Sequence, residues 1–425
     1  MSFVLRQYPW LTYYLLIPGL LLLMAAGARA ELEHSFSGFG TLGLAFNDNA
    51  DLVFRRDVTQ NDGAYNDSTS WITDSLVGVQ WQGRWSPEWE TTLQLVAKDR
   101  FKNTLENSIE WAFIRYRPID GFDVRVGRMG ADVFMLSEYR QVGYAMPWVR
   151  PPHDYYGIAS LYNFDGIDIN RRWVVGDAML NIKGFFGNSD EEYPTGYQSE
   201  SGTKFDFDLL GLTTSLDWNY WKLRYTYAQV TVNSDQGFEL RSALQQLTGV
   251  WPAAAEVIPA LQTRDKKFDY SQVGFNFDNN TWWVQSEFVR LRSEVGLVSD
   301  GEHFYASAGR RFGNLGFYLL GGYAEPRGEI AELSAPAGLP APLATQLNMI
   351  ASATERSLNG VRIKQHSYGL GTRWDFASKM ALKFQIEQFA IDQTGTNLWL
   401  RLDNTAEVTE DQQATLVSMA LDVLF

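Results

Sequence analysis

The sequence has no cysteine in 425 residues. Disulfide bridges, thiolate metal sites and thiol catalysis are therefore excluded. It also lacks an excess of basic charge, because 36 Lys and Arg residues stand against 50 Asp and Glu residues, for a formal net charge of −14 at pH 7. Binding to nucleic acid depends on clustered cations that neutralise phosphates. We therefore expect no nucleic-acid partner.

Beyond residue 30 the sequence has no unbroken apolar run of the roughly 20 residues that a membrane-spanning helix needs. The one apolar stretch lies near the amino terminus, where Leu20 to Ala26 follows Pro18-Gly19 and leads to Ala28-Arg29-Ala30. Such an ending is typical of a signal-peptidase site, whereas a membrane anchor would be longer and uninterrupted. We interpret residues 1–30 as a cleaved signal peptide and residues 31–425 as the folded domain.

Aromatic residues are abundant, at 14% of the chain, although the mean hydropathy is −0.23. Alternating strands reconcile these values, because they place apolar and polar residues on opposite faces. In the segment Ser35–Phe46, one face carries Phe36, Leu42, Leu44 and Phe46, and the other carries Ser35, Ser37, Thr41 and Ala45. This period of two predicts a β-strand.

Similar segments recur along the whole chain and bring the predicted number of strands to about sixteen. They cover 71–82, 90–100, 108–117, 122–128, 165–173, 178–186, 205–217, 221–232, 270–278, 281–292, 302–312, 315–323, 365–374, 379–391 and 414–425. Short turns such as Asn279-Asn280 and Gly313-Asn314 alternate with long polar joins. Short turns at one end and long loops at the other are typical of a transmembrane barrel. The predicted fold is an all-β antiparallel barrel with short periplasmic turns and long extracellular loops.

The last predicted strand has Thr415, Val417, Met419, Leu421, Val423 and Phe425 on one face. An alternating apolar strand that ends in an aromatic residue resembles the signal read by the barrel assembly machinery of the outer membrane. We therefore expect Phe425 to act as an assembly signal.

Together these features resemble the Gram-negative outer-membrane porin superfamily, of the 16-stranded general-diffusion or anion-selective type, over nearly the whole mature chain. The resemblance is one of architecture and involves no diagnostic motif. It implies a homotrimer in the outer membrane, in contact with lipid and lipopolysaccharide. It also implies passive diffusion of small hydrophilic solutes and ions through a water-filled barrel. In this family the third extracellular loop, between the fifth and sixth strands, folds inward as a constriction.

In this chain that loop corresponds to the segment Met129–Phe164 (129–164). The segment is rich in aromatic residues and is stiffened by Pro147 and Pro151-Pro152. A loop of this composition is expected to pack against something, and the inner side of the barrel is available. The alternative is a folded extracellular flap or a loop that contacts another subunit of the trimer.

The candidate constriction residues are charged side chains of this loop and of the strands around it. The loop contributes Asp132, Glu138, Arg140, Arg150 and Asp154, and the strands contribute Arg100, Arg115, Arg125, Arg128 and Arg172. Basic residues opposite loop carboxylates would create a transverse field that filters solutes, with a preference for anions. The alternative is that these residues face water and only pair with each other. Many other carboxylates, such as Asp51 and Asp57, are expected in external loops.

No motif indicates catalysis, a cofactor or a metal. His34, His153, His303 and His366 are widely scattered, without the spacing of a zinc site. The Gly38–Gly43 segment matches GxGxxG, but it lies inside a predicted strand and opens no helix. We assign no catalytic, cofactor-binding or metal-binding residue. The alternatives to a general porin are a selective channel for anions such as phosphate or carboxylates, an outer-membrane barrel enzyme, and a barrel with a plugged lumen.

Overall fold

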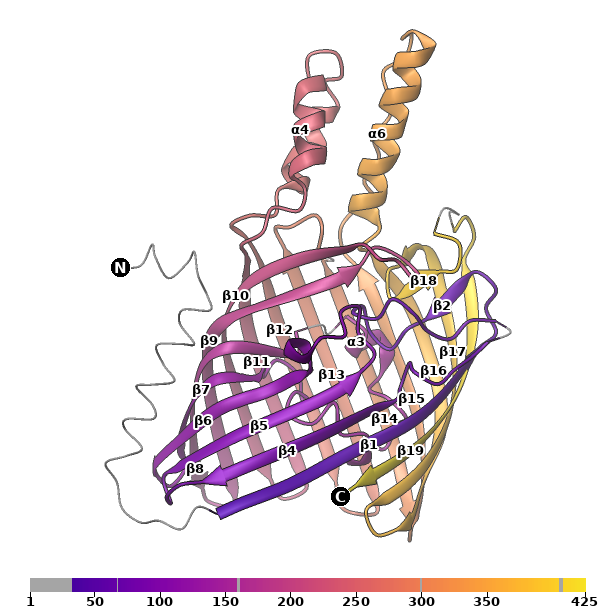
Figure 1. Cartoon of the computed structure of the whole chain (residues 1–425). Helices are drawn as coiled ribbons and strands as arrows, with labels where there is room; N and C mark the ends of the chain where they lie inside the picture. Colours follow the sequence, from indigo (N-terminus) through magenta and orange to yellow (C-terminus); the bar gives the residue numbers. More distant parts are fainter. Residues whose placement is uncertain (1–32, 67, 159–160, 299, 405–407) are drawn as a thin grey trace.

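The computed structural model describes residues 33–66, 68–158, 161–298, 300–404 and 408–425, so the expected signal peptide lies outside the described residues. Sixteen long antiparallel strands and the two-residue strand β3 form one sheet, which closes because β1 pairs with both β19 and β4 (Figure 1). This confirms the predicted barrel. The strands are β1 Glu33–Asn47, β4 Leu76–Arg84, β5 Trp89–Lys98, β6 Ile109–Ile119, β7 Phe122–Gly130, β8 Asn163–Val175, β9 Ala178–Pro194, β10 Gly202–Trp218, β11 Trp221–Val232, β12 Lys266–Asp278, β13 Trp282–Ser293, β14 Gly301–Phe312, β15 Leu315–Pro326, β16 Ile363–Ala377, β17 Met380–Thr396 and β19 Gln412–Leu424.

The shorter elements belong to the loops. They are β2 Leu52–Phe54, β3 Thr69–Ser70, α2 Leu105–Ser108, η1 Gly143–Ala145, α3 His153–Tyr156, α4 Phe238–Leu247, α5 Ala254–Val257, η2 Ile258–Leu261, α6 Ala341–Asn359 and β18 Trp399–Arg401. Strands β2 and β18 pair as a small separate sheet. Helices α4 and α6 stand above the barrel at the end that carries the long loops (Figure 1). Within the described ranges, no helix is long and apolar enough to cross a membrane.

Each predicted strand corresponds to an observed one, with two instructive differences. The strand expected from Trp71 begins only at Leu76, because residues 71–75 bend and the Ser75 hydroxyl donates to the Trp71 carbonyl. Strands β9 and β10 are longer than predicted and pair up to Gly202 and Pro194. Their outward side chains in this extension are polar, which suits a wall that continues past the lipid into water.

The turns opposite the long loops are short and carry backbone conformations that few residues tolerate. Asn219 and Asn280 have φ values of 51° and 66°, and Gly121, Gly176 and Gly313 have φ values of 72°, 62° and 63°. Glycine and asparagine adopt this left-handed region at the lowest cost. The residue types of these turns therefore explain why the hairpins close where the sequence predicts.

The outer surface carries a belt of exposed apolar side chains. Leu319 on β15 is 67% exposed and lies opposite Leu370 of β16, which is also exposed. Trp218, Tyr220 and Trp221 lie at the short-turn end of the belt. An apolar belt edged by aromatic residues matches the lipid-facing surface of a transmembrane barrel.

The substitution Leu319→Arg is expected to lower the free energy of unfolding by about 2–4 kcal/mol, because a guanidinium in the lipid core loses its hydration. Urea titration of the protein folded in lipid vesicles, followed by tryptophan fluorescence, measures this change. Gln346→Arg, on the exposed face of α6, is the matched control and should have little effect. Equal effects of both changes would contradict the lipid-facing assignment of Leu319.

Candidate functional site

The long join between β7 and β8 lies inside the barrel. We call its described residues, 131–158 and 161–162, the inner loop. The Trp148 indole N–H donates to the Ser307 hydroxyl of β14 at 2.9 Å, and the Val149 amide donates to the Gln385 side chain of β17 at 3.0 Å. Gly143 lies so close to the far wall that an added Cβ would sit 2.1 Å from the Asp422 carboxylate. The inner loop therefore crosses the lumen and contacts strands on its far side.

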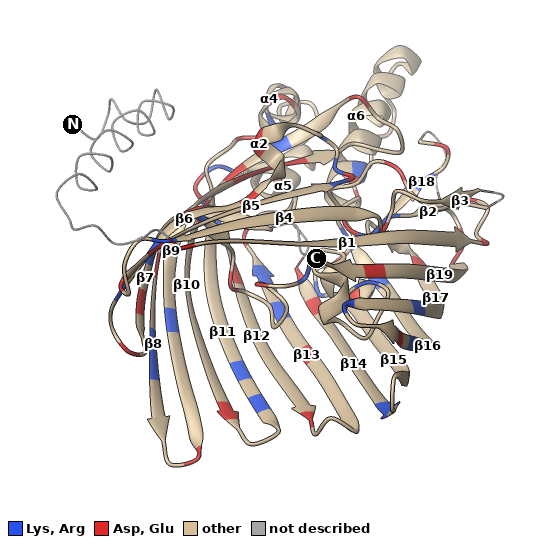
Figure 2. Ribbon diagram, turned by 60° about the horizontal axis from the view of Figure 1, so that its bottom comes forward, with Lys and Arg blue, Asp and Glu red and all other residues tan. Residues whose placement is uncertain are grey.

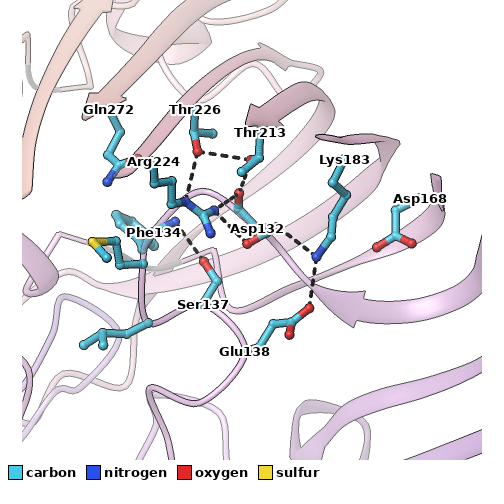
Figure 3. Close-up of polar contacts among 12 residues, drawn as sticks. Asp132, Phe134, Ser137, Glu138, Asp168, Lys183, Thr213, Arg224, Thr226 and Gln272 are labelled. Carbon is cyan, nitrogen blue, oxygen red and sulfur yellow. Dashed lines mark hydrogen bonds and ion pairs between the residues drawn. The ribbon is translucent and has the colours of Figure 1, made fainter. Parts of the chain in front are cut away.

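At its beginning the inner loop joins a group of charged residues that we call the constriction cluster: Asp132, Glu138, Arg125, Asp168, Lys183 and Arg224. The Asp132 carboxylate lies 2.8 Å from Lys183 and 2.7 Å from Arg224 (Figure 3). Glu138 accepts from Lys183 at 3.0 Å. The wall strands β9 and β11 thus hold the carboxylates of Asp132 and Glu138.

The charges of the constriction cluster are balanced. Arg125 donates from Nε to Asp168 at 3.0 Å, so three cations face three carboxylates. Burial would raise the pKa of Asp132, but the Arg224 and Lys183 charges outweigh it and hold that pKa well below its usual range. Lys183 likewise lowers the pKa of Glu138. Asp132 and Glu138 are therefore ionised at neutral pH, and the balanced set gives the expected anion preference no support.

On the opposite side of the barrel, Arg150 anchors the inner loop. Its side chain is only 1% exposed, and its Nε donates to Asp74 at 2.8 Å. Its Nη1 donates to Glu387 of β17 at 3.0 Å, and its Nη2 donates to the Ser418 hydroxyl of β19 at 2.6 Å. Undocking of the loop would separate Arg150 from these carboxylates. This separation opposes undocking, because Asp74 and Glu387 would lose the cation that compensates their burial.

A third contact involves Asp154 in α3. Its carboxylate accepts from Gln365 at 2.5 Å and from Ser367, and its carbonyl lies 2.8 Å from Nδ1 of His303. Burial raises the pKa of Asp154 to about 7, although these side-chain hydrogen bonds lower it. Burial and the nearby Arg150 lower the pKa of His153 to about 3. The docked loop therefore favours the uncharged forms of these two adjacent residues.

The inner loop and the wall leave little surface open to water at this level. Lys383 and Glu387 on β17 and Glu287 on β13 are almost completely buried, and Lys383 donates to the loop carbonyls of Gly143 and Trp148 at 2.7 and 2.8 Å. Glu138 differs, because half of its side chain is exposed. The lumen is thus nearly filled where the loop crosses it, and Glu138 marks a part of the cluster that water reaches.

The sequence matches no protein-family model and no curated protein. Its barrel is similar to OmpF of Salmonella typhi, solved in complex with daunomycin, with a TM-score of 0.50, 11% identity, and coverage of 92% of this chain and 97% of that one. OprB of Pseudomonas putida has a TM-score of 0.46 and 11% identity, with coverage of 92% of this chain and 94% of that one. A mutant of the Rh. blastica porin has a TM-score of 0.43 and 12% identity, with coverage of 92% of this chain and 100% of that one. The chain has the fold of the outer-membrane porins. At these identities the likeness concerns the fold alone.

Within this porin fold, the predicted site residues fall into separate places. Arg125, Asp132 and Glu138 meet in the constriction cluster, whereas Arg150 and Asp154 lie across the lumen from it. Four others lie apart from both groups: Arg100 pairs with Glu110, Arg115 with Glu90 at 3.1 Å, Arg172 with Asp123 at 3.5 Å, and Arg140 stacks over Tyr162 and donates to the Leu161 carbonyl. Arg115 therefore faces the lumen, on the side of Glu90, as its cost in lipid predicts.

Arg128 does not face the pore. It lies three residues after Arg125 on β7, and an odd spacing places two residues on opposite faces of a strand. Its guanidinium pairs with Asp165, which lies opposite it on β8 and on the other face from the inward Asp168. The expectation of Arg128 as a constriction residue was wrong, because it overlooked this alternation.

The first loop also folds inward, which the sequence analysis missed. Phe54 of β2 is buried against Phe389 and Trp399, with ring centroids 6.3 and 5.3 Å apart. Asp57, expected in an exposed external loop, is only 3% exposed. The apolar triplet Leu52-Val53-Phe54 within a polar stretch was the available signal, since such a triplet needs a buried partner.

Removing the Arg150 anchor by Arg150→Gln should destabilise the protein by about 3–5 kcal/mol, because Asp74 and Glu387 then stay buried without their cation. Urea titration should show this loss together with faster amide exchange in residues 143–157. Arg84→Gln breaks the exposed pair with Glu33 and is the matched control, with an expected effect of about 0–1 kcal/mol. If both substitutions behaved alike, Arg150 would not anchor the loop.

His153 and Asp154 should give loop docking opposite pH dependences. The pKa of Asp154 is 3.8 when the loop is undocked and about 7 when it is docked. Ionisation of Asp154 therefore weakens docking as the pH rises between these values. The pKa of His153 is 6.5 when the loop is undocked and about 3 when it is docked. Protonation of His153 therefore weakens docking as the pH falls below 6.5. With increasing pH from 4 to 6.5, protection of the 155–157 amides should fall in His153→Gln and rise in Asp154→Asn. Hydrogen exchange corrected for intrinsic rates measures both slopes, and equal slopes would contradict the assignment.

Proposed function

We propose that this chain is a narrow, selective channel of the outer membrane that passes small solutes by passive diffusion. The observation that carries the proposal is the inner loop, which is docked to opposite sides of the barrel by Asp132 and Arg150. A wide pore for general diffusion needs a lumen lined by water-exposed side chains, and here the inward residues beside the loop are buried. A solute that crosses must therefore pass between the loop and the wall.

Charged residues of both signs are distributed along the barrel strands, seen obliquely from the short-turn end in Figure 2. In the constriction cluster they are paired, so the structure supports selection by size and hydrogen bonding more than by charge sign. Passage of phosphate or carboxylates is a weaker candidate, because each cation of the cluster already has a carboxylate partner.

Several parts of the proposal rest on the resemblance and on the apolar belt. We propose insertion into the outer membrane by the barrel assembly machinery, with Phe425 as the assembly signal, and contact of the belt with lipid and lipopolysaccharide. A homotrimer is a further prediction, which closure of the current in three equal steps would support.

We propose no enzymatic activity. Ser367, His303 and Asp154 do meet, but the serine hydroxyl donates to the carboxylate, and His303 contacts the backbone carbonyl of Asp154. No histidine in this group is thus placed to take a proton from the serine, which a serine hydrolase requires.

Replacing residues 134–158 by a short Gly/Ser linker should raise the single-channel conductance several-fold, because the loop no longer fills the lumen. Planar-bilayer recordings of the refolded protein measure the change, and the reversal potential in a salt gradient should lie near zero for the wild type. Shortening helix α6, which stands above the barrel, by residues 341–352 is the matched control and should leave the conductance unchanged. A wild-type conductance as large as that of the loop-replaced protein would overturn the proposal.

A further inference from the structure

The inner face of the barrel changes its polarity along strands β10 to β13. Near the short-turn end these strands direct polar side chains inward, such as Thr213, Arg224 and Glu287. Toward the long loops the inward positions become apolar, with Leu209, Val230 and others on the same strands: Phe205, Phe207, Ala228, Phe268, Val289 and Leu291. A water-filled vestibule would be expected to keep polar side chains on its inner wall, so it does not explain this change.

The outer face changes in the opposite sense at the same level. Asp206 and Asp208 of β10, Asp269 of β12 and Arg290 and Arg292 of β13 point outward, between the inward apolar positions. This part of the wall is therefore polar outside and apolar inside, as in water-soluble barrels that enclose a ligand. This polarity is expected of a wall whose outer face stands in water beyond the lipid-facing belt.

The apolar positions enclose a cavity of about 430 Å³. Its wall is strongly aromatic, with Phe205, Phe207, Phe268 and Tyr270 from the strands and Phe134 and Tyr155 from the inner loop. The rings meet mostly edge to face, for example Phe207 and Phe268 at 6.1 Å and 89°, and Phe134 and Tyr270 at 5.5 Å and 84°. Ring edges and faces presented in this way suit contact with another aromatic ring.

The cavity wall carries a cation, and its hydrogen bonds go to the protein. Among the described residues that line it, Arg55 is the only charged one, and its Nε, Nη1 and Nη2 all donate to backbone carbonyls, including those of Leu398, Val58 and Asn397. The Tyr155 and Tyr270 hydroxyls hydrogen-bond to each other at 3.2 Å. A charged ligand would lose its hydration here and would meet only Arg55, whose guanidinium is already held by backbone carbonyls, which disfavours its binding.

We propose that this cavity binds an uncharged aromatic molecule before it passes the inner loop. An apolar cavity of about 150 Å³ suffices for benzene, so a volume of about 430 Å³ leaves room for two or three fused rings. The proposal rests on the proposed channel function and names its solute class. Phe134 lies two residues from Asp132 and Tyr155 lies next to Asp154, so the floor of the cavity belongs to the segment that the loop anchors hold.

Binding of naphthalene to the refolded protein in lipid nanodiscs tests the proposal by equilibrium dialysis, with empty nanodiscs subtracted. We expect saturable binding of one molecule per chain. Naphthalene-2-carboxylate at pH 7 should bind at least about tenfold more weakly, because its charge meets only Arg55, which is already held by backbone carbonyls. Equal binding of the carboxylate, or the absence of saturable naphthalene binding, would overturn the proposal. Saturable binding of decane in place of naphthalene would overturn the aromatic assignment and indicate an acyl-chain site.

Two neighbouring substitutions on β11 localise the binding. Ala228→Trp fills the cavity and should weaken naphthalene binding at least about tenfold, whereas Gln229→Trp points outward at the same level and should leave it unchanged. Val230→Phe fills the cavity less and should give an intermediate loss if Ala228→Trp fails to fold. Equal binding by the inward and outward variants would overturn the proposal. The conductance of the loop-replaced protein is independent of this result, so the channel function and the binding cavity can fail separately.

Discussion

The pairing of buried charges between the inner loop and the barrel wall is the interaction on which the interior depends. Arg150 is surrounded by Asp74, Glu387 and Ser418, and Asp132 lies between Lys183 and Arg224. A buried charge without its partner strongly destabilises the fold. The pairs therefore favour the one position of the loop in which all of them form. The two groups lie on opposite sides of the lumen and together hold the loop across it. This arrangement keeps the loop across the barrel and buries the inward side chains beside it.

The loop also divides the interior into two chemical environments. On the side of the short turns, charged and polar side chains face the lumen, and half of Glu138 is exposed to water. On the side of the long loops, strands β10–β13 enclose an apolar, aromatic cavity whose floor is Phe134 and Tyr155. In the proposed channel, a solute that moves between these environments would exchange apolar contacts for hydrogen bonds at the constriction cluster. Such a sequence of contacts selects by chemistry as well as by size.

The strands and turns of the barrel were predictable from local signals. Period-two alternation located all sixteen long strands, and Asn280 and Gly313 marked turns that need positive φ. Aromatic and proline residues in the segment 129–164 indicated a packed loop. The same alternation, applied strictly, would have placed Arg128 outside. The burial of Phe54 was less accessible, because it depends on strand β18, more than 340 residues further along the chain. The burial of Asp57 depends on the path of the inner loop, whose Tyr162 hydroxyl donates to its carboxylate.

The sequence by itself determined the barrel, because the alternating residues of each strand show that one of its faces is apolar and the other polar. It also identified the charged residues that are available to form a constriction. Only the tertiary structure decided which of them meet: Arg150 pairs with Glu387, 237 residues away, and Asp132 with Arg224, 92 residues away. The reversal from a polar to an apolar inner wall likewise became visible only once four strands were aligned in register. Pairing across a closed barrel depends on strand register and loop path, which no local pattern specifies.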